Sequence, residues 1–412
     1  MRILMLAQWY PPILGGEELH VANLSRALVA RGHDVTVATL RQQGLADEEL
    51  DGDVRVVRVA GGLQRFEALF ADSARRSAAP IPDPLLTLAI NRIVNRFRPD
   101  VMHAHNWLVH AALPIRAARG IPLVQTLHDF SLVCAQKVLL RYGRACSGPG
   151  PIKCLTCTAD HYGVVKGPVT TISNWADGIA QRRLVDRFIA VSRAVAEGTG
   201  LTDERHEVIP NFVPDETARP PDAAAYLAQL PSEPYFLFVG ALGRLKGLEV
   251  LLRAYRAEPT LPPLVLIGYR TRETEELLHG LPQNVVALGQ WPHPAVQLAW
   301  GGAIAGLLPS ICQEACPTVA IEAMRAGRPV IASRLGGSID LVEDRGTGIL
   351  VAPEDHLGLL DALRELAGDP RLAATMGALA RERSEDYTAS AVVPRIEAVY
   401  GSVTAGEFAT AG

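Results

Sequence analysis

Short apolar runs alternate along the chain with longer segments in which apolar side chains recur every three or four positions. The runs are typical of strands buried on both faces, and the wider spacing is typical of amphipathic helices. At the start, an apolar run over Met1–Ala7 precedes a helix with Val21, Leu24 and Leu28 on one face, and another run covers Asp34–Leu40. This order of strand, helix and strand predicts a parallel pair of strands.

The same alternation continues through two parts of the chain. In the first part, strands are expected at Val54–Ala60, within Asp100–Trp107, at Pro122–Leu127, at Arg187–Val191 and at Glu207–Ile209, with a helix at Pro84–Phe97. In the second part, strands alternating with helices are expected at Tyr235–Val239, Leu264–Ile267, Asn284–Leu288, Ala303–Leu308 and Val330–Ser333. The pattern predicts an α/β fold of two Rossmann-like, doubly wound domains that face a central cleft.

The length of 412 residues exceeds one ordinary hydrophobic core, which also favours two domains. A proline-rich stretch with weak periodicity predicts the linker. We expect an N-terminal domain over 1–215, a linker over 216–234, a second domain over 235–385, and a C-terminal helix and tail over 386–412 that can pack back on the first domain. A loop-rich insert is expected at about 130–170, and an irregular surface excursion at 61–83.

Composition and charge exclude several function classes. The net charge is −4, and no basic block is longer than Arg182-Arg183, so a nucleic-acid partner is not expected. No apolar run approaches the roughly 20 residues of a membrane-spanning helix, and Met1 leads directly into a strand instead of a signal peptide. We expect a cytoplasmic protein without a transmembrane segment. Peripheral membrane contact through an amphipathic face stays open, and the oligomeric state is not encoded in a readable way.

Two glutamates flank the start of a predicted helix. Pro317 suits a first helical position and Gly327 suits the end of the helix. Glu314 lies just before this helix and Glu322 lies on its second turn, so both carboxylates can face a ligand over the positive helix N-terminus. Such a site fits an anionic, hydroxyl-rich ligand. The alternative is two solvated carboxylates.

A glycine pair, Gly15-Gly16, follows the first predicted strand and precedes a helix. Glycine lets the backbone approach a ligand closely, and the helix N-terminus favours phosphate. The full dinucleotide fingerprint and the Lys-Ser/Thr ending of a P-loop are both missing, so a simple tight turn is the alternative. Polar side chains also follow two other strands, at His103–Asn106 and at His128-Asp129, and they predict a cleft lip. The alternative for each histidine is a satisfied hydrogen-bonding role.

Four cysteines fall within the predicted insert, namely Cys134, Cys146, Cys154 and Cys157. The last two form a C-x-x-C, and disulfides are disfavoured in a cytoplasmic protein. A tetrahedral structural zinc is one interpretation of the four thiols. Unligated thiols and a redox pair are the alternatives. A closed four-cysteine site would serve as scaffolding, because it leaves no position open for chemistry.

Several short motifs occur together along the chain. They are Pro11-Pro12 with Gly15-Gly16, Arg31-Gly32-His33, Asp100–Asn106, Thr126–Asp129, Val191-Ser192, Val208–Asn211, Val239-Gly240, Lys246-Gly247, the stretch from Glu314 to Glu322, and Gly327–Val330. From Met1 to about Tyr400 the chain resembles the family 4 glycosyltransferases, which are retaining enzymes of the two-domain GT-B fold. The cysteine segment resembles a subgroup with a four-cysteine insert.

The resemblance implies that the C-terminal domain binds a sugar nucleotide and the N-terminal domain binds the acceptor. Glu314 matches the glutamate that contacts donor-sugar hydroxyls, and Glu322 matches the one that takes the ribose hydroxyls. Lys246 matches the cation that neutralises the diphosphate. Further donor contacts are implied for Gly240 and for the backbone of Cys316, Pro317, Thr318 and Val319.

On the N-terminal side, the resemblance implies that the Gly16 amide closes over the diphosphate and that His128 hydrogen-bonds the donor sugar. The sequence departs from the family at two places. Ala241 stands where an arginine is common, and Arg244 is expected to supply the missing charge. Gly268-Tyr269-Arg270 replaces a common Gly-Asp-Gly, which concerns recognition of the base. A UDP-sugar is the expected donor, with a GDP-sugar as the alternative.

The expected reaction is retaining, front-face transfer of a sugar to an acceptor hydroxyl, in which the departing phosphate helps to deprotonate the acceptor and no catalytic metal takes part. Cations, amides and a helix dipole at the leaving group suit this chemistry. Two rival functions are a sugar-nucleotide epimerase of the same architecture and a non-catalytic sugar-nucleotide binding protein. For the acceptor, a polysaccharide intermediate, a lipid-linked sugar and a small natural product all stay open.

Overall fold

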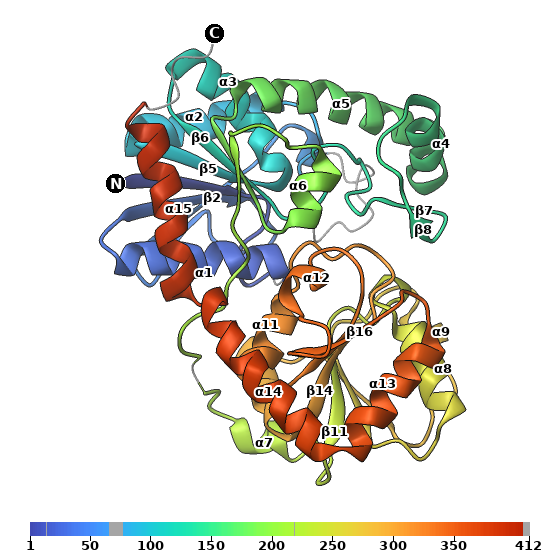
Figure 1. Ribbon diagram of the computed structural model, residues 1–412. Helices are drawn as coiled ribbons and strands as arrows, with labels where there is room; N and C mark the ends of the chain where they lie inside the picture. The colour runs from blue at the N-terminus through green and yellow to red at the C-terminus, as the bar shows by residue number, and fades with distance from the viewer. Residues whose placement is uncertain (14, 66–76, 218, 407–412) are drawn as a thin grey trace. The chain divides into compact units, whose positions relative to one another are not determined.

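The computed structural model describes residues 1–13, 15–65, 77–217 and 219–406 (Figure 1). The chain forms two compact units. The first comprises residues 1–141, 146–210 and the chain from 392 on, and the second comprises residues 142–145 and 211–391. The predicted linker therefore lies within the second unit, where it contains the short helix α7 (Ala223–Leu227). Part of the predicted 61–83 excursion lies outside the described residues.

The first unit is built on an eight-stranded sheet in the order β10-β9-β6-β5-β1-β2-β4-β3. Its strands are β1 (Arg2–Ala7), β2 (Asp34–Leu40), β3 (Glu48–Asp51), β4 (Val54–Val59), β5 (Val101–His105), β6 (Leu123–Leu127), β9 (Arg187–Ala190) and β10 (His206–Val208). All neighbours pair in parallel except β3 with β4. The central strand β1 is buried at every position after Arg2, as expected for a parallel strand covered on both faces.

Helices cover both faces of this sheet (Figure 1). They are α1 (Gly16–Ala30), α2 (Pro84–Phe97), α3 (Val109–Arg119), α4 (Pro151–Tyr162), α5 (Lys166–Leu184), α6 (Arg193–Thr199) and most of α15 (Ala389–Thr404), with the 3-10 turns η1 (Leu63–Arg65) and η3 (Asn106–Leu108). The start of α2 shows why these residues form a helix: the Asp83 carboxylate caps the amides of Leu85 and Leu86, and Pro84 occupies the first turn. α15 is joined to this unit by Tyr400, whose hydroxyl lies 2.6 Å from Nδ1 of His103.

The second unit is built on a six-stranded parallel sheet in the order β13-β12-β11-β14-β15-β16. Its strands are β11 (Tyr235–Val239), β12 (Leu264–Ile267), β13 (Val285–Gly289), β14 (Ala303–Leu308), β15 (Val330–Ser333) and β16 (Gly348–Val351). Its longer helices are α8 (Leu248–Ala257), α10 (His293–Ala299), α11 (Thr318–Arg325), α13 (His356–Gly368) and α14 (Pro370–Ser384), and its short ones are α9 (Thr274–Leu277), α12 (Ser338–Leu341) and the turns η4 (Arg244–Lys246), η5 (Trp300–Gly302) and η6 (Glu385–Tyr387).

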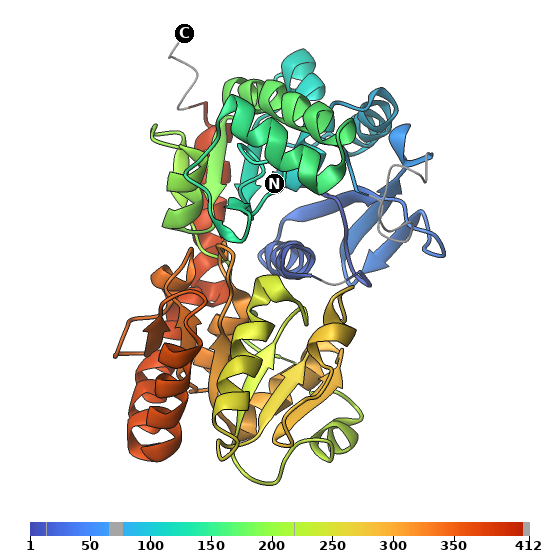
Figure 2. The ribbon, with the colours of Figure 1, turned by 90° about the vertical axis from the view of Figure 1, so that its right-hand side faces the viewer.

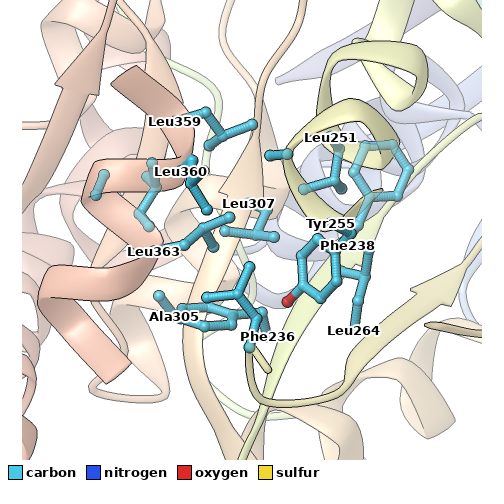
Figure 3. Close-up of a cluster of buried hydrophobic side chains, with 14 of the residues drawn as sticks. Phe236, Phe238, Leu251, Tyr255, Leu264, Ala305, Leu307, Leu359, Leu360 and Leu363 are labelled. Carbon is cyan, nitrogen blue, oxygen red and sulfur yellow. The ribbon is translucent and has the colours of Figure 1, made fainter. Parts of the chain in front are cut away.

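The core of the second unit lies between its sheet and the helices α8 and α13 (Figure 3). Phe236 and Leu307 from neighbouring strands meet Leu251 from α8 and Leu363 from α13, and all four are at most 1% exposed. This packing holds the strands in place. The loops that follow their carboxyl ends then lie together, where ligands bind in sheets of this kind.

The segment expected to be loop-rich at about 130–170 differs from the prediction. It contains the short strands β7 (Leu140–Arg141) and β8 (Arg144–Ala145), but the helices α4 and α5 make up most of its second half. Pro151 occupies the first turn of α4, a position where a proline favours the start of a helix. Among the residues that the structure describes, none of the helices combines the length and apolarity that crossing a bilayer requires.

Candidate functional site

In the second unit, the loop between β14 and α11 carries Glu314. Its backbone is held by the turn that follows β15, because the amide of Gly337 donates to the carbonyl oxygen of Glu314 at 2.6 Å. A side chain at Gly336 would place its Cβ 2.4 Å from the same oxygen, so only glycine fits there. Pro317 is the N-cap residue, and α11 begins at Thr318, one residue later than predicted.

Glu314 pairs with Lys246 from the loop after β11. The Lys246 ammonium lies 2.7 and 2.8 Å from the two carboxylate oxygens, and the Ser310 hydroxyl donates to one of them at 2.6 Å. The Glu314 side chain is only 13% exposed, while that of Lys246 is 38% exposed. The pair is therefore held at the protein surface with its carboxylate inside and its cation reaching toward solvent.

The electrostatics of this pair keep both groups charged. Burial alone would lower the pKa of Lys246, but the Glu314 carboxylate outweighs it and the pKa is raised. Burial alone would raise the pKa of Glu314, but the charge and hydrogen bonds of Lys246 and the Ser310 hydroxyl outweigh it and the pKa is lowered. The amide end of a helix attracts anions, so the lysine of such an ion pair can leave its carboxylate partner and bind an anionic ligand there.

Close backbone contacts place the Lys246 loop. A Cβ at Gly247, whose φ is +76°, would lie 1.7 Å from the carbonyl oxygen of Pro309, so the loops after β11 and β14 touch through glycine. The predicted donor residue Gly240 has a φ of +152° and lies against Gly268, where a Cβ would come within 1.6 Å of the Gly240 carbonyl oxygen. Both contacts leave room for backbone only.

The carboxylate of Glu322 takes part in a separate network. One of its oxygens lies 3.0 Å from Nε2 of His293, and the other accepts from Nε2 of Gln297 at 2.8 Å. Burial by itself lowers the pKa of His293, but the hydrogen bond and charge of Glu322 outweigh it and the pKa is raised. The three side chains line a cavity of about 170 Å³, together with Arg325. The structure thus brings Lys246 and Glu314 together. The carboxylate of Glu322 instead bonds to side chains of α10.

Arg244, predicted to replace the family arginine, is engaged elsewhere. Its guanidinium forms ion pairs with Glu249 and with Glu276, the latter at 2.7 Å, and its backbone amide donates to Glu273. To reach a ligand beside Lys246 it would have to leave two carboxylates. Its role in binding stays a prediction.

The predicted backbone contacts lie at the start of α11. The side chain of Asn211 donates to the carbonyl oxygen of Cys316 at 3.0 Å and so fixes this end of the loop. The first amides of any α-helix lack intrahelical acceptors, and here they belong to Thr318 and Val319. Burial raises the pKa of the Cys316 thiol to about 12, so this thiol is not a nucleophile at neutral pH.

In the first unit, Gly15 is the N-cap residue of α1 and Gly16 is its first residue. A Cβ at Gly15 would overlap the carboxylate of Glu18, whereas one at Gly16 would meet no atom within 4 Å. The backbone at Gly16 therefore faces open space, as a ligand-contacting glycine should. The backbone amides at the start of α1 would donate hydrogen bonds to a phosphate.

His128 lies among other histidines. Its Nε2 is 2.9 Å from Nδ1 of His105, and its ring meets that of His20 edge-on at 4.8 Å. Burial, with neighbouring histidines, lowers the pKa of both His105 and His20 well below its ordinary value, so these rings are neutral at pH 7. In a neutral pair, one of the two facing nitrogens donates and the other accepts.

A polar cluster next to His128 was only partly visible in the sequence. The side-chain amide of Asn106 donates to Glu17 at 2.8 Å, and its oxygen accepts from the Lys137 ammonium at 2.5 Å. Lys137 also lies 3.8 Å from Asp129 and 4.1 Å from the centre of the Trp107 ring. The position of Asn106 and Asp129 after apolar strands was a signal, but Lys137 offered none because its loop has no periodicity.

The four insert cysteines line one small cavity of about 30 Å³, namely Cys134, Cys146, Cys154 and Cys157. Within the described residues, however, no group of three or more His, Cys, Asp or Glu side chains is arranged to hold a metal ion. The sulfur of Cys157 accepts from Gln136 Nε2 at 3.1 Å, and that of Cys154 accepts from the Gly150 amide at 3.3 Å. The predicted structural zinc and the four-cysteine subgroup are therefore not supported, and the cysteines are free thiols.

Comparison with known proteins adds to this geometry. The family model for Glycosyltransferase Family 4 matches residues 14–217, and that for Glycosyl transferases group 1 matches residues 233–369. The chain is a family 4 glycosyltransferase. The predicted family and enzyme class are thus confirmed.

Relatives and solved structures agree with this glycosyltransferase assignment. The chain is 29% identical over 436 residues to a glycogen synthase of Mycobacterium tuberculosis, covering 99% of this chain and 96% of the relative. It is 29% identical to a D-inositol 3-phosphate glycosyltransferase of Xylanimonas cellulosilytica, covering 92% and 90%. Among solved structures, sucrose-phosphate synthase from Thermosynechococcus elongatus has a TM-score of 0.77 at 23% identity, covering 98% and 99%. This likeness shows that the glycosyltransferase has the GT-B fold, as predicted.

Proposed function

We propose that this glycosyltransferase moves a sugar from a nucleotide-diphosphate sugar to an acceptor hydroxyl, with retention of configuration. The observation that carries the proposal is the half-buried Lys246–Glu314 pair beside the amide end of α11. A diphosphate needs a cation and N–H donors, and a sugar needs a carboxylate acceptor for its hydroxyls. A similar fold from Anabaena, HepE, was solved with UDP-glucose, at a TM-score of 0.72 and 19% identity over 98% of this chain and all of that one. We take a UDP-sugar as the donor on this basis.

In the proposed roles, Lys246 neutralises the diphosphate and Glu314 accepts hydrogen bonds from donor-sugar hydroxyls. The amides of Thr318 and Val319 supply donors to the phosphate oxygens, reinforced by the helix dipole. Glu322, oriented by His293, takes the ribose hydroxyls. These groups act on the charge that develops at the leaving group, where preorganised donors have their largest effect.

The first unit supplies the remaining predicted groups. His128 hydrogen-bonds the donor sugar, and the amide of Gly16 contacts the diphosphate. His105 holds the ring of His128 through the 2.9 Å contact with its Nε2 atom. A cytoplasmic location, where the nucleotide sugar would be met, is part of the same proposal.

The proposed chemical step needs no enzyme nucleophile. The bond between the anomeric carbon and the phosphate oxygen breaks, the acceptor oxygen bonds to the same face of that carbon, and the acceptor proton passes to the departing phosphate. Lys246 offsets the negative charge that forms on the phosphate, and this electrostatic stabilisation is the protein's main contribution.

We also propose that the transfer needs no catalytic metal. The sequence contains one Asp-x-Asp, Asp51-Gly52-Asp53, whose paired carboxylates could suggest a site for a hard cation. Asp51 already accepts from the Tyr10 hydroxyl at 2.7 Å and from the Arg26 guanidinium at 2.7 Å. This carboxylate is therefore neutralised by the protein. Transfer in the presence of a chelator should match transfer without it.

The test is incubation of the purified protein with UDP-, GDP-, ADP- and TDP-sugars, alone and with candidate acceptors. Slow release of free nucleoside diphosphate, accelerated by an acceptor, supports a transferase. A changed sugar that is still attached to nucleotide would instead identify an epimerase. Binding of a sugar nucleotide without any turnover, with all acceptor classes supplied, would identify a non-catalytic binding protein and overturn the proposal.

A further inference from the structure

Helix α5 of the first unit is oriented with polar residues inward. Its buried positions are Gly167, Thr171, Asn174, Asp177, Gly178 and Gln181. A surface helix of a globular protein normally buries its apolar stripe and exposes its polar face. In α5 the two faces are exchanged.

The orientation of α5 is fixed by specific contacts, so it is not an accident of a loosely held helix. A Cβ at Gly167 would come within 2.2 Å of the Thr158 carbonyl oxygen, so this face must be glycine where α4 crosses it. The Thr171 hydroxyl lies 2.7 Å from that of Thr158, and Gln181 accepts from Gln125 at 2.9 Å. Rotating the helix would lose these buried hydrogen bonds and clash at the glycine.

The outward face is apolar over the length of the helix. Val165 is 75% exposed, Val169 62%, Ile172 57% and Ile179 56%, and Ala176 is exposed between the last two. These positions are separated alternately by four and three residues, so they form one stripe. Val164, which is 82% exposed, continues the apolar row beyond Val165. Together these residues are called the α5 surface.

Figures 1 and 2 show α4 and α5, in green, as neighbours on the outside of the first unit. Isolated exposed apolar side chains are ordinary, but a contiguous row of them marks an interaction site. Thr171 and Gln181 on the inward face are hydrogen-bonded, whereas the apolar stripe on the outward face is left in contact with water, which is unfavourable.

The charge around the α5 surface is basic. Helix α5 itself contains three basic residues, Lys166, Arg182 and Arg183, and one acid, Asp177, a net charge of +2, although the whole chain carries −4. The acid, Asp177, is buried against His110, and burial raises its pKa to about 6. Lys166 and Arg183 are exposed at the two ends of the stripe. An apolar row flanked by cations complements an anionic, amphiphilic surface.

We propose that the α5 surface docks on a membrane containing anionic lipids, with the helix lying along the lipid interface. The apolar stripe enters the boundary between headgroups and acyl chains, and the lysine and arginine side chains contact lipid phosphates. The proposal does not depend on the proposed function. It would bring this transferase to a surface where a lipid-linked acceptor resides.

A second copy of the chain fits the α5 surface less well. Two α5 helices paired in antiparallel about the centre of the stripe would bring Lys166 of each copy beside Arg183 of the other. A parallel pair would bring each of these cations beside its own equivalent. Both arrangements place like charges together at the ends of the interface, which is unfavourable for helix pairing.

The test is co-flotation of the full chain with vesicles of equal parts phosphatidylcholine and phosphatidylglycerol, and with vesicles of phosphatidylcholine alone. Binding to the anionic vesicles is expected, weakening as salt is added. The double variant Val169→Glu with Ile172→Glu should reduce the vesicle partition coefficient by about tenfold or more, since it removes apolar contact and adds repulsion. Lys166→Glu with Arg183→Glu should reduce it at low salt.

The matched control is Leu88→Glu on α2, an exposed leucine of the same unit, which should bind vesicles like the unmodified chain. Donor turnover and the thermal unfolding midpoint verify that each variant is folded. Absence of vesicle binding, or binding that the Val169/Ile172 variant retains, would overturn the proposal. A concentration-dependent dimer in light scattering that this variant abolishes would also overturn it, in favour of a second copy.

Discussion

The Lys246 ammonium lies within 2.8 Å of both carboxylate oxygens of Glu314, although the two residues are 68 positions apart in the chain. Each lies in the loop after a strand, and these strands, β11 and β14, are neighbours in the sheet. The fold therefore builds the pair before any ligand arrives. A diphosphate would draw the cation from the carboxylate, which frees Glu314 to accept from sugar hydroxyls.

Replacing Lys246 by alanine is expected to lower kcat/KM for sugar transfer by roughly 100- to 1,000-fold, because the leaving phosphate loses its cation. Glu314→Ala should cause a loss of similar size. Steady-state release of nucleoside diphosphate with a competent acceptor measures both. The control is Arg253→Ala, an exposed arginine of α8, which should change kcat/KM by less than about twofold. Near-normal turnover by both Lys246→Ala and Glu314→Ala would sink these roles.

His293 is expected to control donor affinity through Glu322. Its pKa is raised by Glu322, so the ion pair stabilises the fold below the ordinary histidine pKa and this contribution is lost as pH rises through the folded pKa. His293→Gln keeps a hydrogen-bond donor but cannot titrate. The variant should raise the donor KM with little change in kcat, and it should flatten the rise of KM with pH. Gln297→Ala is the comparison, since it removes the other hydrogen bond and leaves the titrating group in place. An unchanged pH profile in His293→Gln would contradict this role.

Much of the fold could be predicted because buried parallel strands leave a simple pattern. The ends of β11, β12 and β14 match the expected ranges Tyr235–Val239, Leu264–Ile267 and Ala303–Leu308. These runs are apolar at nearly every position, and helical packing on both faces demands that pattern. The helix at Pro84–Phe97 also matches, since its capping aspartate and first-turn proline act within a few residues.

The missed features depend on contacts between distant segments. The inward face of α5 is not apolar, so the spacing of apolar residues does not predict how this helix packs. Its orientation is set by contacts of Gly167 and Thr171 with α4. In the site, Glu322 could be recognised as a functional residue, but its partners His293 and Gln297 are on a neighbouring helix. Side-chain partners of this kind are set by the fold, and spacing along the chain does not encode them.

Asn106 is expected to stabilise the first unit through both its backbone and its side chain. Its φ of +55° is a left-handed conformation that asparagine tolerates and alanine does not, and its side chain joins Glu17 to Lys137. Asn106→Gly relieves the backbone cost and removes only the hydrogen bonds, whereas Asn106→Ala incurs both. We expect Asn106→Ala to lower the free energy of unfolding by about 2–4 kcal/mol, and by about 1 kcal/mol more than Asn106→Gly. Denaturant unfolding measures the difference, and equal losses would show that the left-handed backbone carries no cost.

Glu17 gives the cluster a pH dependence. Burial, followed by the neighbouring Glu18, raises the pKa of Glu17 from an ordinary 4.5 to about 8. Between these values the folded chain binds more protons at this site than the unfolded chain, so ionising Glu17 destabilises the fold progressively as pH rises. Glu17→Gln removes the titration and keeps an oxygen to accept from Asn106. The unfolding midpoint of the variant minus that of the unmodified chain should therefore increase from about pH 5 upward and become constant above pH 8. Glu197→Gln, an exposed glutamate of α6, controls for the loss of one charge and should show no such rise. A constant difference between Glu17→Gln and the unmodified chain across this range would mean that Glu17 is ionised in the folded protein throughout.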